Sequence, residues 1–87
     1  MSVYVDNMKA PFGRMIMCHM IADNIDELHA MADKIGVSRR WFQGKTANAH
    51  YDICMSKRAL AVEYGAVELT MMQLGRKLRE IKTNACC

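Results

Sequence analysis

The feature that most constrains the fold is an apolar run, Met15–Ala22, followed directly by a strong helix start at Asn24. A nearly continuous apolar segment of this length is typical of a β-strand that is covered on both faces. Asn24 and Glu27 have the spacing of a capping box, in which each side chain satisfies a free backbone N–H group. Apolar residues then recur at helical spacing until Gly36, a common helix stop. A strand that passes so directly into a helix predicts a sheet with helices packed on it.

The rest of the chain alternates between strand and helix patterns in the same way. Three more segments are rich in β-branched or aromatic residues and are predicted to be strands: residues 2–5, 39–43 and 66–69. Residues 7–13, which contain the only proline, and the polar residues 44–49 are predicted to be loops. The order of elements is then strand, strand, helix, strand, helix, strand, helix.

Two further helices have recognisable ends. Ser56 can cap a helix that runs to Tyr64 and ends at Gly65. Thr70 and Gln73 repeat the capping-box spacing and begin a third helix. The expected fold class is therefore α/β or α+β, with a small four-stranded mixed sheet and about three helices packed on it.

The composition agrees with one compact domain over residues 1–87, with a frayed C-terminal tail at 83–87. Hydrophobic residues make up 52% of the chain and charged residues 24%, which is enough apolar surface to form a core. No apolar run is long enough to cross a bilayer, and the opening residues lack the pattern of a secretory signal. The four cysteines include no Cys-x-x-Cys pair and are expected to be free thiols. We therefore expect a cytoplasmic protein with no membrane partner.

Acidic and imidazole side chains follow the predicted strands where those strands end. Asp6 follows the first strand, Asp23 follows the second, and His50 and Asp52 follow the third. If these strands are parallel, their ends meet at one edge of the sheet, where open α/β folds bind ligands. Carboxylates at such an edge can hold Mg²⁺ or Mn²⁺, so Asp6, Asp23 and Asp52 are candidate metal ligands, together with His19 if it flanks the site.

His50, Asp52 and Asp6 are also the candidate catalytic residues. An imidazole can transfer protons near neutral pH, and a neighbouring carboxylate can orient it. Each residue has a structural reading as well: Asp6 can stabilise a loop, and Asp23 is favoured at the start of a helix. His19 lies within an apolar strand, where a histidine is commonly a hydrogen-bonded core residue.

Positive side chains provide the case for a phosphate-containing partner. The formal net charge is only +3, but eight of the twelve basic residues follow residue 39. Lys57 and Arg58 lie at the start of the second predicted helix, where cations and free backbone N–H groups can bind a phosphate. Arg40, beside Trp41 and Phe42, is a further candidate phosphate contact, because aromatic side chains can stack on nucleic-acid bases. The ordinary alternative is that these charges form a solvated face and that the aromatic pair is core.

Several short motifs, taken together, resemble a known family. They are Tyr-Val-Asp at 4–6, His-Met at 19–20, Glu-Leu-His at 27–29 and His-Tyr-Asp-Ile at 50–53, continuing through Lys57-Arg58 to Gly65-Ala66. On these motifs, which span nearly the whole chain, the protein is similar to a short bacterial and phage domain of unknown function, family 4031. The resemblance implies an origin in the cytoplasm of a bacterium or a phage-infected cell, and it implies no particular activity.

Three hypotheses of function follow, one catalytic and two not. The first is a domain that binds the phosphate of a nucleotide or nucleic acid and performs metal-assisted phosphoester chemistry. The second is a small phage or bacterial protein that binds and modulates a host protein without catalysis. The third is a nucleic-acid-binding module that uses Arg39, Arg40, Trp41 and the third helix. The sequence contains no Gly-rich phosphate loop, nucleophile elbow or zinc-protease motif that would favour a common enzyme class.

Overall fold

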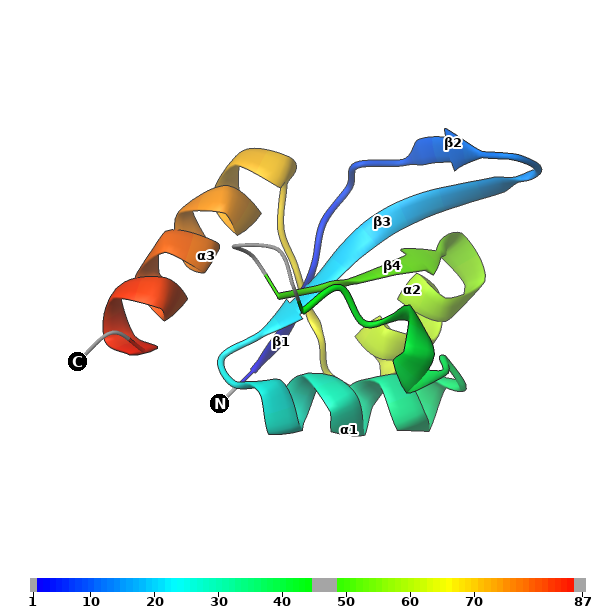
Figure 1. The fold of residues 1–87 in the computed structure, drawn as a ribbon. Helices are drawn as coiled ribbons and strands as arrows, with labels where there is room; N and C mark the ends of the chain where they lie inside the picture. The colour runs from blue at the N-terminus through cyan, green and yellow to red at the C-terminus, as the bar shows by residue number, and fades with distance from the viewer. Residues whose placement is uncertain (1, 45–48, 86–87) are drawn as a thin grey trace.

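The chain folds into a mixed sheet flanked by helices (Figure 1). The structure, a computed structural model, describes residues 2–44 and 49–85. The strands are β1 (Val3–Val5), β2 (Ala10–Phe12), β3 (Met15–Ala22), β4 (Tyr51–Cys54) and β5 (Val67–Glu68). The helices are α1 (Ile25–Ile35), α2 (Met55–Glu63) and α3 (Met71–Ala85), with a short 3-10 turn, η1 (Arg39–Trp41), between α1 and β4. This arrangement confirms the expected α+β class, although the sheet has five strands rather than four.

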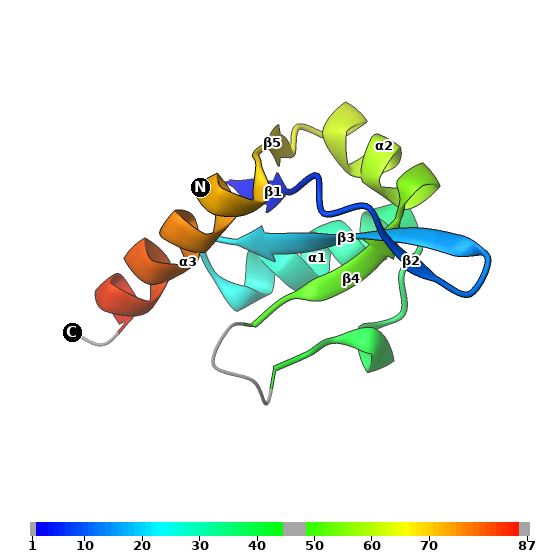
Figure 2. The same cartoon turned by 90° about the horizontal axis from the view of Figure 1, so that it is seen from above.

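β3 is the central strand, and its length lets it pair with three others. Its first half pairs with β2 and its second half with β1, both antiparallel. β4 pairs antiparallel along the other edge of β3. β5 extends the sheet by pairing with β1 in parallel, so the sheet is mixed. Figure 2 shows β3 running along the molecule with β4 on one side and β1 on the other, and Figure 1 shows β2 and β4 on opposite sides of β3.

Alternation along the strands divides the core between the two faces of the sheet. On one face, Val5 and Met20 are buried against α1 and α2. On the other face, Tyr4 and Ile21 are buried against Leu74 of α3. Successive side chains of a strand point to opposite faces, which is why neighbours such as Met20 and Ile21 belong to different clusters. The sheet therefore has a face that α1 and α2 cover and a face that carries α3.

Both predicted helix caps are present. Asn24 Oδ1 accepts a hydrogen bond from the backbone N–H of Glu27 at 2.8 Å, and α1 ends at Gly36 with φ of 80°. At the start of α3, the N–H of Gln73 donates to Thr70 Oγ1 at 3.2 Å, and the Gln73 side chain accepts from the N–H of Thr70 at 2.9 Å. Each cap satisfies backbone groups that a helix end leaves unpaired, so its signal is local in the sequence.

The strand predicted over residues 39–43 is wrong. Ser38 caps a single turn of 3-10 helix there, because its hydroxyl accepts a hydrogen bond from a backbone N–H of the turn. The strand that follows α1 is β4 instead, which lies between the polar loop predicted at 44–49 and the second predicted helix. Tyr51 and Ile53 are the buried residues of β4, and the polar Asp52 between them makes the segment look like a turn in the sequence.

Two other element boundaries differ from the prediction. β2 lies within residues 7–13, predicted to be a loop, and Pro11 is tolerated because β2 is an edge strand. α2 begins at Met55 with Cys54 as its cap residue, whereas a Ser56 cap is predicted. The Ser56 hydroxyl instead forms a hydrogen bond of 3.2 Å with the Cys54 thiol.

The end of the chain and one loop bear on the remaining expectations. α3 runs to Ala85 and so includes part of the tail, residues 83–87, that the sequence pattern predicts to be frayed. Residues 86–87, and residues 45–48 within the predicted polar loop, lie outside the described residues. None of the helices in the described part of the chain is long and apolar enough to span a membrane.

Candidate functional site

Four polar residues from neighbouring strands meet on one face of the sheet. His19 of β3 is the direct cross-strand partner of Asp52 in β4, so both side chains point to the same face. His50 precedes Asp52 by two positions and shares this face, because side chains alternate along the chain of a strand. On the other side of β3, Asp6 follows the last residue of β1 and lies beside His19. We call Asp6, His19, His50 and Asp52 the polar cluster.

The way these residues meet corrects the sequence argument. That argument places Asp6, Asp23 and Asp52 at the shared edge of parallel strands, but β1 and β4 are both antiparallel to β3. Asp6 and Asp23 therefore lie at opposite ends of β1. Asp23 accepts hydrogen bonds from the N–H of Ser2 at 2.8 Å and from the Tyr4 hydroxyl at 3.0 Å. The structure does not bring Asp23 into the polar cluster.

Asp6 holds the His19 side chain in one orientation. Asp6 is 1% exposed, and its Oδ2 lies 2.7 Å from Nδ1 of His19. Its Oδ1 accepts the backbone N–H groups of His19 at 2.8 Å and Met8 at 3.1 Å. An ionised carboxylate only accepts hydrogen bonds, so we assign the proton of the imidazole to Nδ1. Nε2 of His19 is then the nitrogen with a free lone pair, directed toward β4.

Asp52 lies between the two imidazoles. Its Oδ1 is 3.8 Å from Nε2 of His19 and 3.5 Å from Nε2 of His50. These distances are too long for good hydrogen bonds. The same oxygen is buried and has no hydrogen-bond partner among the described residues. A buried oxygen of a carboxylate without a partner is costly and requires an explanation.

The three side chains have the composition and spacing of a metal site. The ligand atoms offered by His19, His50 and Asp52 all lie within 4.8 Å of one another. In a tetrahedral zinc site with bonds of about 2.0–2.1 Å, neighbouring ligand atoms are about 3.4 Å apart. The distances from Asp52 Oδ1 to the two nitrogens are already near this value. A histidine ligand whose other nitrogen binds a carboxylate, as His19 does with Asp6, is the usual outer arrangement of such sites.

Two titratable side chains next to the polar cluster have shifted pKa values. Burial raises the pKa of Tyr51, whose hydroxyl lies 2.7 Å from Nδ1 of His29. A hydrogen bond with the Ser56 hydroxyl lowers the pKa of the Cys54 thiol, and backbone N–H groups at the start of α2 act in the same direction. Tyr51 is buried in the core between the sheet and α1. His29, which contacts Tyr51, therefore lies on the opposite face of the sheet from the polar cluster.

Two of the candidate phosphate contacts have partners inside the protein. Arg58 Nε donates a hydrogen bond of 2.7 Å to the backbone oxygen of Asp6, and its guanidinium also pairs with Glu68 at 2.9 Å. The guanidinium of Arg40 lies over the ring of Trp41, 5.0 Å from its centre. Arg58 thus connects α2 to the residue that follows β1, through the backbone of Asp6.

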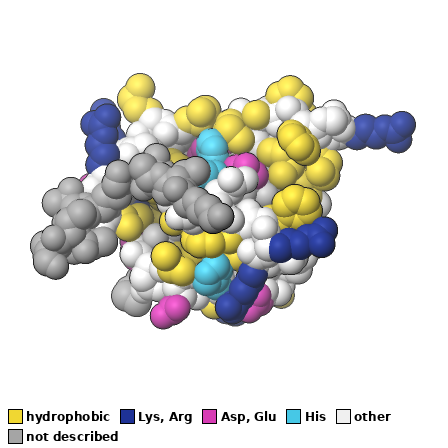
Figure 3. Space-filling model, in the orientation of Figure 1, with side chains coloured by type: hydrophobic (Ala, Val, Ile, Leu, Met, Phe, Trp, Pro, Cys, Tyr) yellow, Lys and Arg dark blue, Asp and Glu magenta, His cyan; other side chains and the backbone are white. Residues whose placement is uncertain are grey.

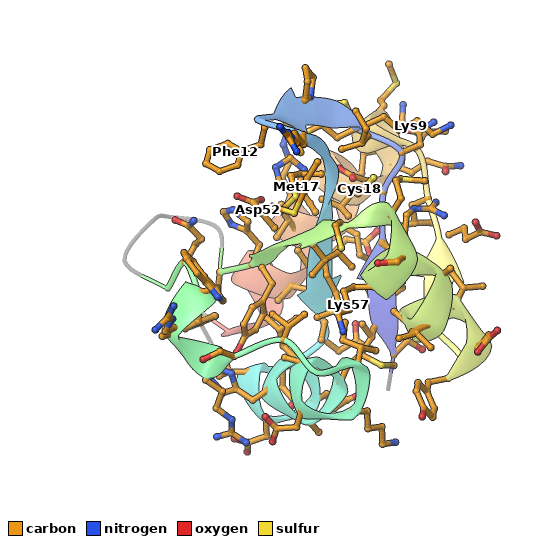
Figure 4. The ribbon with its side chains drawn as sticks, turned by 90° about the vertical axis from the view of Figure 1, so that its right-hand side faces the viewer. Lys9, Phe12, Met17, Cys18, Asp52 and Lys57 are labelled. Carbon is orange, nitrogen blue, oxygen red and sulfur yellow. The ribbon has the colours of Figure 1, made fainter. Side chains whose placement is uncertain are left out.

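Lys57 lies away from the polar cluster. Figure 4 shows it beside α1, well separated from Asp52. Its Nζ is 3.2 Å from the position that a Cβ atom would occupy on Gly36. Lys57 therefore lies at the C-terminal end of α1, where the helix dipole favours a cation.

The structure also contains a pocket that the sequence analysis does not single out. Its volume is about 570 Å³, and it lies between the β2–β3 hairpin, β4 and the segment after α1. Asp52 lines it together with Phe12, Met17 and Trp41, and Figure 4 shows Phe12 and Met17 on the same side of the sheet as Asp52. On the face of the molecule drawn in Figure 3, a histidine side chain and an acidic one lie together among hydrophobic side chains. The available signal was the turn at Gly13 between two apolar segments, which is typical of a hairpin.

Comparison with known proteins identifies a family but no characterised relative. The family model described as "Protein of unknown function (DUF4031)" matches residues 3–81. The matched range includes every member of the polar cluster, and the match confirms the resemblance seen in the sequence. No curated protein and no solved structure gives a significant match.

Proposed function

We propose that this chain, which belongs to the family of proteins of unknown function DUF4031, binds a divalent transition-metal ion through His19, His50 and Asp52 and catalyses a hydrolytic reaction there. The observation that carries the proposal is the buried Oδ1 of Asp52. This oxygen faces two imidazole nitrogens and has no hydrogen-bond partner among the described residues. A cation between the three ligand atoms would give this oxygen a partner.

The ligand set favours a different metal from the one expected from the sequence. Mg²⁺ and Mn²⁺ prefer oxygen ligands, whereas imidazole ligands suit Zn²⁺ and Fe²⁺. The site offers two imidazoles and one carboxylate, and Asp6, the other expected ligand, already accepts three hydrogen bonds. Zn²⁺ is therefore the first ion to test, with Mg²⁺ and Mn²⁺ as the comparison.

Three protein ligands leave a coordination position for water, which is the pattern of catalytic zinc sites. A metal ion in such a site supplies a Lewis acid and lowers the pKa of bound water. Asp6 would keep Nε2 of His19 directed at the ion, because its carboxylate fixes both the tautomer and the orientation of the ring. Phosphoester hydrolysis, the reaction expected from the sequence, is one of the reactions that such a centre performs.

Calorimetric titration of the purified protein with Zn²⁺ tests the proposal. We expect one equivalent to bind to the unaltered chain, and binding to be lost in His50→Ala and Asp52→Asn. Asp33→Asn is the matched control, because Asp33 is an exposed carboxylate that pairs with Arg39 outside the polar cluster. Equal zinc affinity in Asp52→Asn and Asp33→Asn would contradict the proposal.

A second proposal, a protein that binds and modulates a host protein without catalysis, is favoured by a separate observation. The tip of the β2–β3 hairpin exposes several hydrophobic side chains, with Phe12 71% and Ile16 41% exposed. Large exposed hydrophobic side chains that lie together commonly mark a contact surface. Affinity capture from a bacterial lysate with the unaltered chain and with Ile16→Ser would test it, and recovery of the same proteins by both would count against the hairpin as the contact.

A further inference from the structure

We infer that the pocket beside Asp52 binds the apolar part of an uncharged ester, whose carbonyl group then lies next to the metal centre. The part of this inference that concerns hydrolysis of the ester rests on the proposed function, because it needs the metal ion. Binding in the pocket can be tested without the metal, so the two can fail separately.

The walls of the pocket are large hydrophobic side chains that remain exposed. Phe12 is 71% exposed, Trp41 57% and Met15 47%, and all three line the same hollow. Its volume of about 570 Å³ lies in the range of small-molecule sites, which are mostly apolar with few polar groups. A ligand with an alkyl or aryl group would bury these side chains and gain the free energy of removing them from water.

The charge of the pocket argues against a phosphate-bearing ligand. Among the described residues that line it, Asp52 is the only one with a charged side chain, and it is negative. Arg58, which is paired with Glu68, does not line the pocket, and Lys57 contributes no lining side chain, although its ammonium group lies beside the lining residue Gly36. In the metal-free protein, a dianionic phosphate would lose water and meet a carboxylate, which is unfavourable in a partly desolvated site.

An ester suits both the apolar pocket and the proposed metal centre beside it. Its carbonyl oxygen has no formal charge, so Asp52 repels it less than it repels a phosphate, and it is a suitable group for polarisation by a metal ion. In the hydrolysis, water adds to the carbonyl carbon and the bond from that carbon to the alcohol oxygen breaks. The alcohol leaves with one proton of the water, and the acid keeps the remaining hydroxyl group. The step needs no oxidant and no reductant.

Trp41 makes the binding directly measurable. It is the only tryptophan in the chain and lines the pocket, so its fluorescence reports on the occupant. We compare ethyl hexanoate with hexyl phosphate, which both contain a linear chain of six carbon atoms but differ in charge, on the metal-free protein. The neutral ester should bind at least about tenfold more tightly, the effect of one unfavourable charge contact. Equal or tighter binding of hexyl phosphate, or no fluorescence change with the ester, would overturn the inference.

A pair of equally exposed hydrophobic residues locates the binding. Phe12→Ser removes one wall of the pocket and should weaken the binding of ethyl hexanoate about fivefold. Met72→Ser is the control, because Met72 is 72% exposed but lies on α3, outside the pocket. Both changes are at exposed positions, so both variants should fold. If the two variants bind the ester equally well, the pocket is not its site.

The reaction itself is tested on the zinc-loaded protein with 4-nitrophenyl hexanoate and 4-nitrophenyl phosphate. We expect hydrolysis of the first substrate only, slower in Phe12→Ser with its zinc affinity unchanged. Zinc binding without ester binding would overturn this inference and leave the metal proposal standing. Ester binding without zinc binding would overturn the metal proposal and leave the pocket assignment standing. Hydrolysis of the phosphate at a comparable rate would overturn the assignment of an uncharged substrate.

Discussion

The two ends of one sheet face differ in what satisfies their side chains. At one end, Tyr4 and Ile21 are buried under Leu74 of α3, and the contact is almost wholly apolar. At the other end, His19 of β3 and Asp52 of β4 point to the same face, but they are partly exposed and their neighbours are other polar groups. His19 and Ile21 are only two positions apart on β3, so one strand contributes a residue to each end.

The difference shows that a helix, and not the sheet, decides which end becomes core. α3 supplies an apolar stripe that removes Ile21 from water, which stabilises the fold. The polar cluster supplies little burial of apolar area, and it contains a carboxylate oxygen without a hydrogen-bond partner among the described residues. Sites that serve function commonly have this kind of locally unfavourable arrangement.

Ile21→Ala should have the largest effect on stability. Ile21 is 1% exposed under α3, and deleting its buried atoms leaves a cavity that costs about 2–5 kcal/mol of unfolding free energy. Urea denaturation followed by circular dichroism measures this loss. The zinc affinity of the folded variant should fall far less, because Ile21 is not one of the proposed ligands. A loss of zinc affinity as large as the loss of stability would mean that the two ends are not independent.

Asp6→Asn should affect both properties. The amide cannot replace an ionised acceptor for three hydrogen bonds, so we expect a loss of about 1–3 kcal/mol in unfolding free energy. Zinc affinity should fall about 10- to 100-fold, as for other changes to the group behind a histidine ligand. Denaturation and calorimetry on the same preparation measure the two effects. A variant with normal zinc affinity would show that Asp6 does not position His19.

Asp52→Asn should separate the two properties. Without metal, replacing a charge whose Oδ1 lacks a hydrogen-bond partner should leave the unfolding free energy unchanged or raise it by less than about 1 kcal/mol. With zinc at 100 times its Kd, the unaltered chain should gain about 2.7 kcal/mol, and the variant should gain nothing. Melting curves with and without zinc provide the measurement. A large destabilisation of the metal-free variant would instead make Asp52 a structural residue.

Asp33→Asn should have the smallest effect, because Asp33 belongs to neither end of the face. The hydrogen bond from Arg39 lowers the pKa of Asp33 below its ordinary value. A lowered pKa means that the pair stabilises the fold above the ordinary pKa, and that this contribution is lost as the pH falls through the lowered value. Since both side chains are exposed, the variant should show only a slightly flatter fall of the urea midpoint between neutral and acidic pH, and an identical midpoint at acid pH. A midpoint at neutral pH shifted as far as that of Ile21→Ala would contradict this.

Some elements could be read from the sequence because their signals are local. Asn24 with Glu27, and Thr70 with Gln73, form the two helix caps at the predicted residues. β4 could not be read in this way, because Asp52 interrupts its apolar pattern. Asp52 is also a member of the polar cluster, so the residue that prevented the prediction of β4 is one that indicated the site.

The polar cluster was predicted in part for a reason that the structure corrects. Asp6, His19, His50 and Asp52 were recognised by their chemistry, but the expected meeting place was a shared end of parallel strands. They meet on the face of antiparallel strands instead, and this geometry leaves Asp23 at the far end of β1. The pocket was not predicted at all, since its walls come from segments that pack together only after folding.

The sequence by itself determined the chemical groups available, the capped helices, the α+β class and the family. These depend on residue identity and on spacings within a turn or two of the chain. The tertiary structure alone decided which groups are neighbours, which face α3 covers, and which ionisable side chains already have partners. Strand register joins residues far apart in the chain, such as His19 and Asp52, and is set by the packing of the whole sheet, which no local pattern contains.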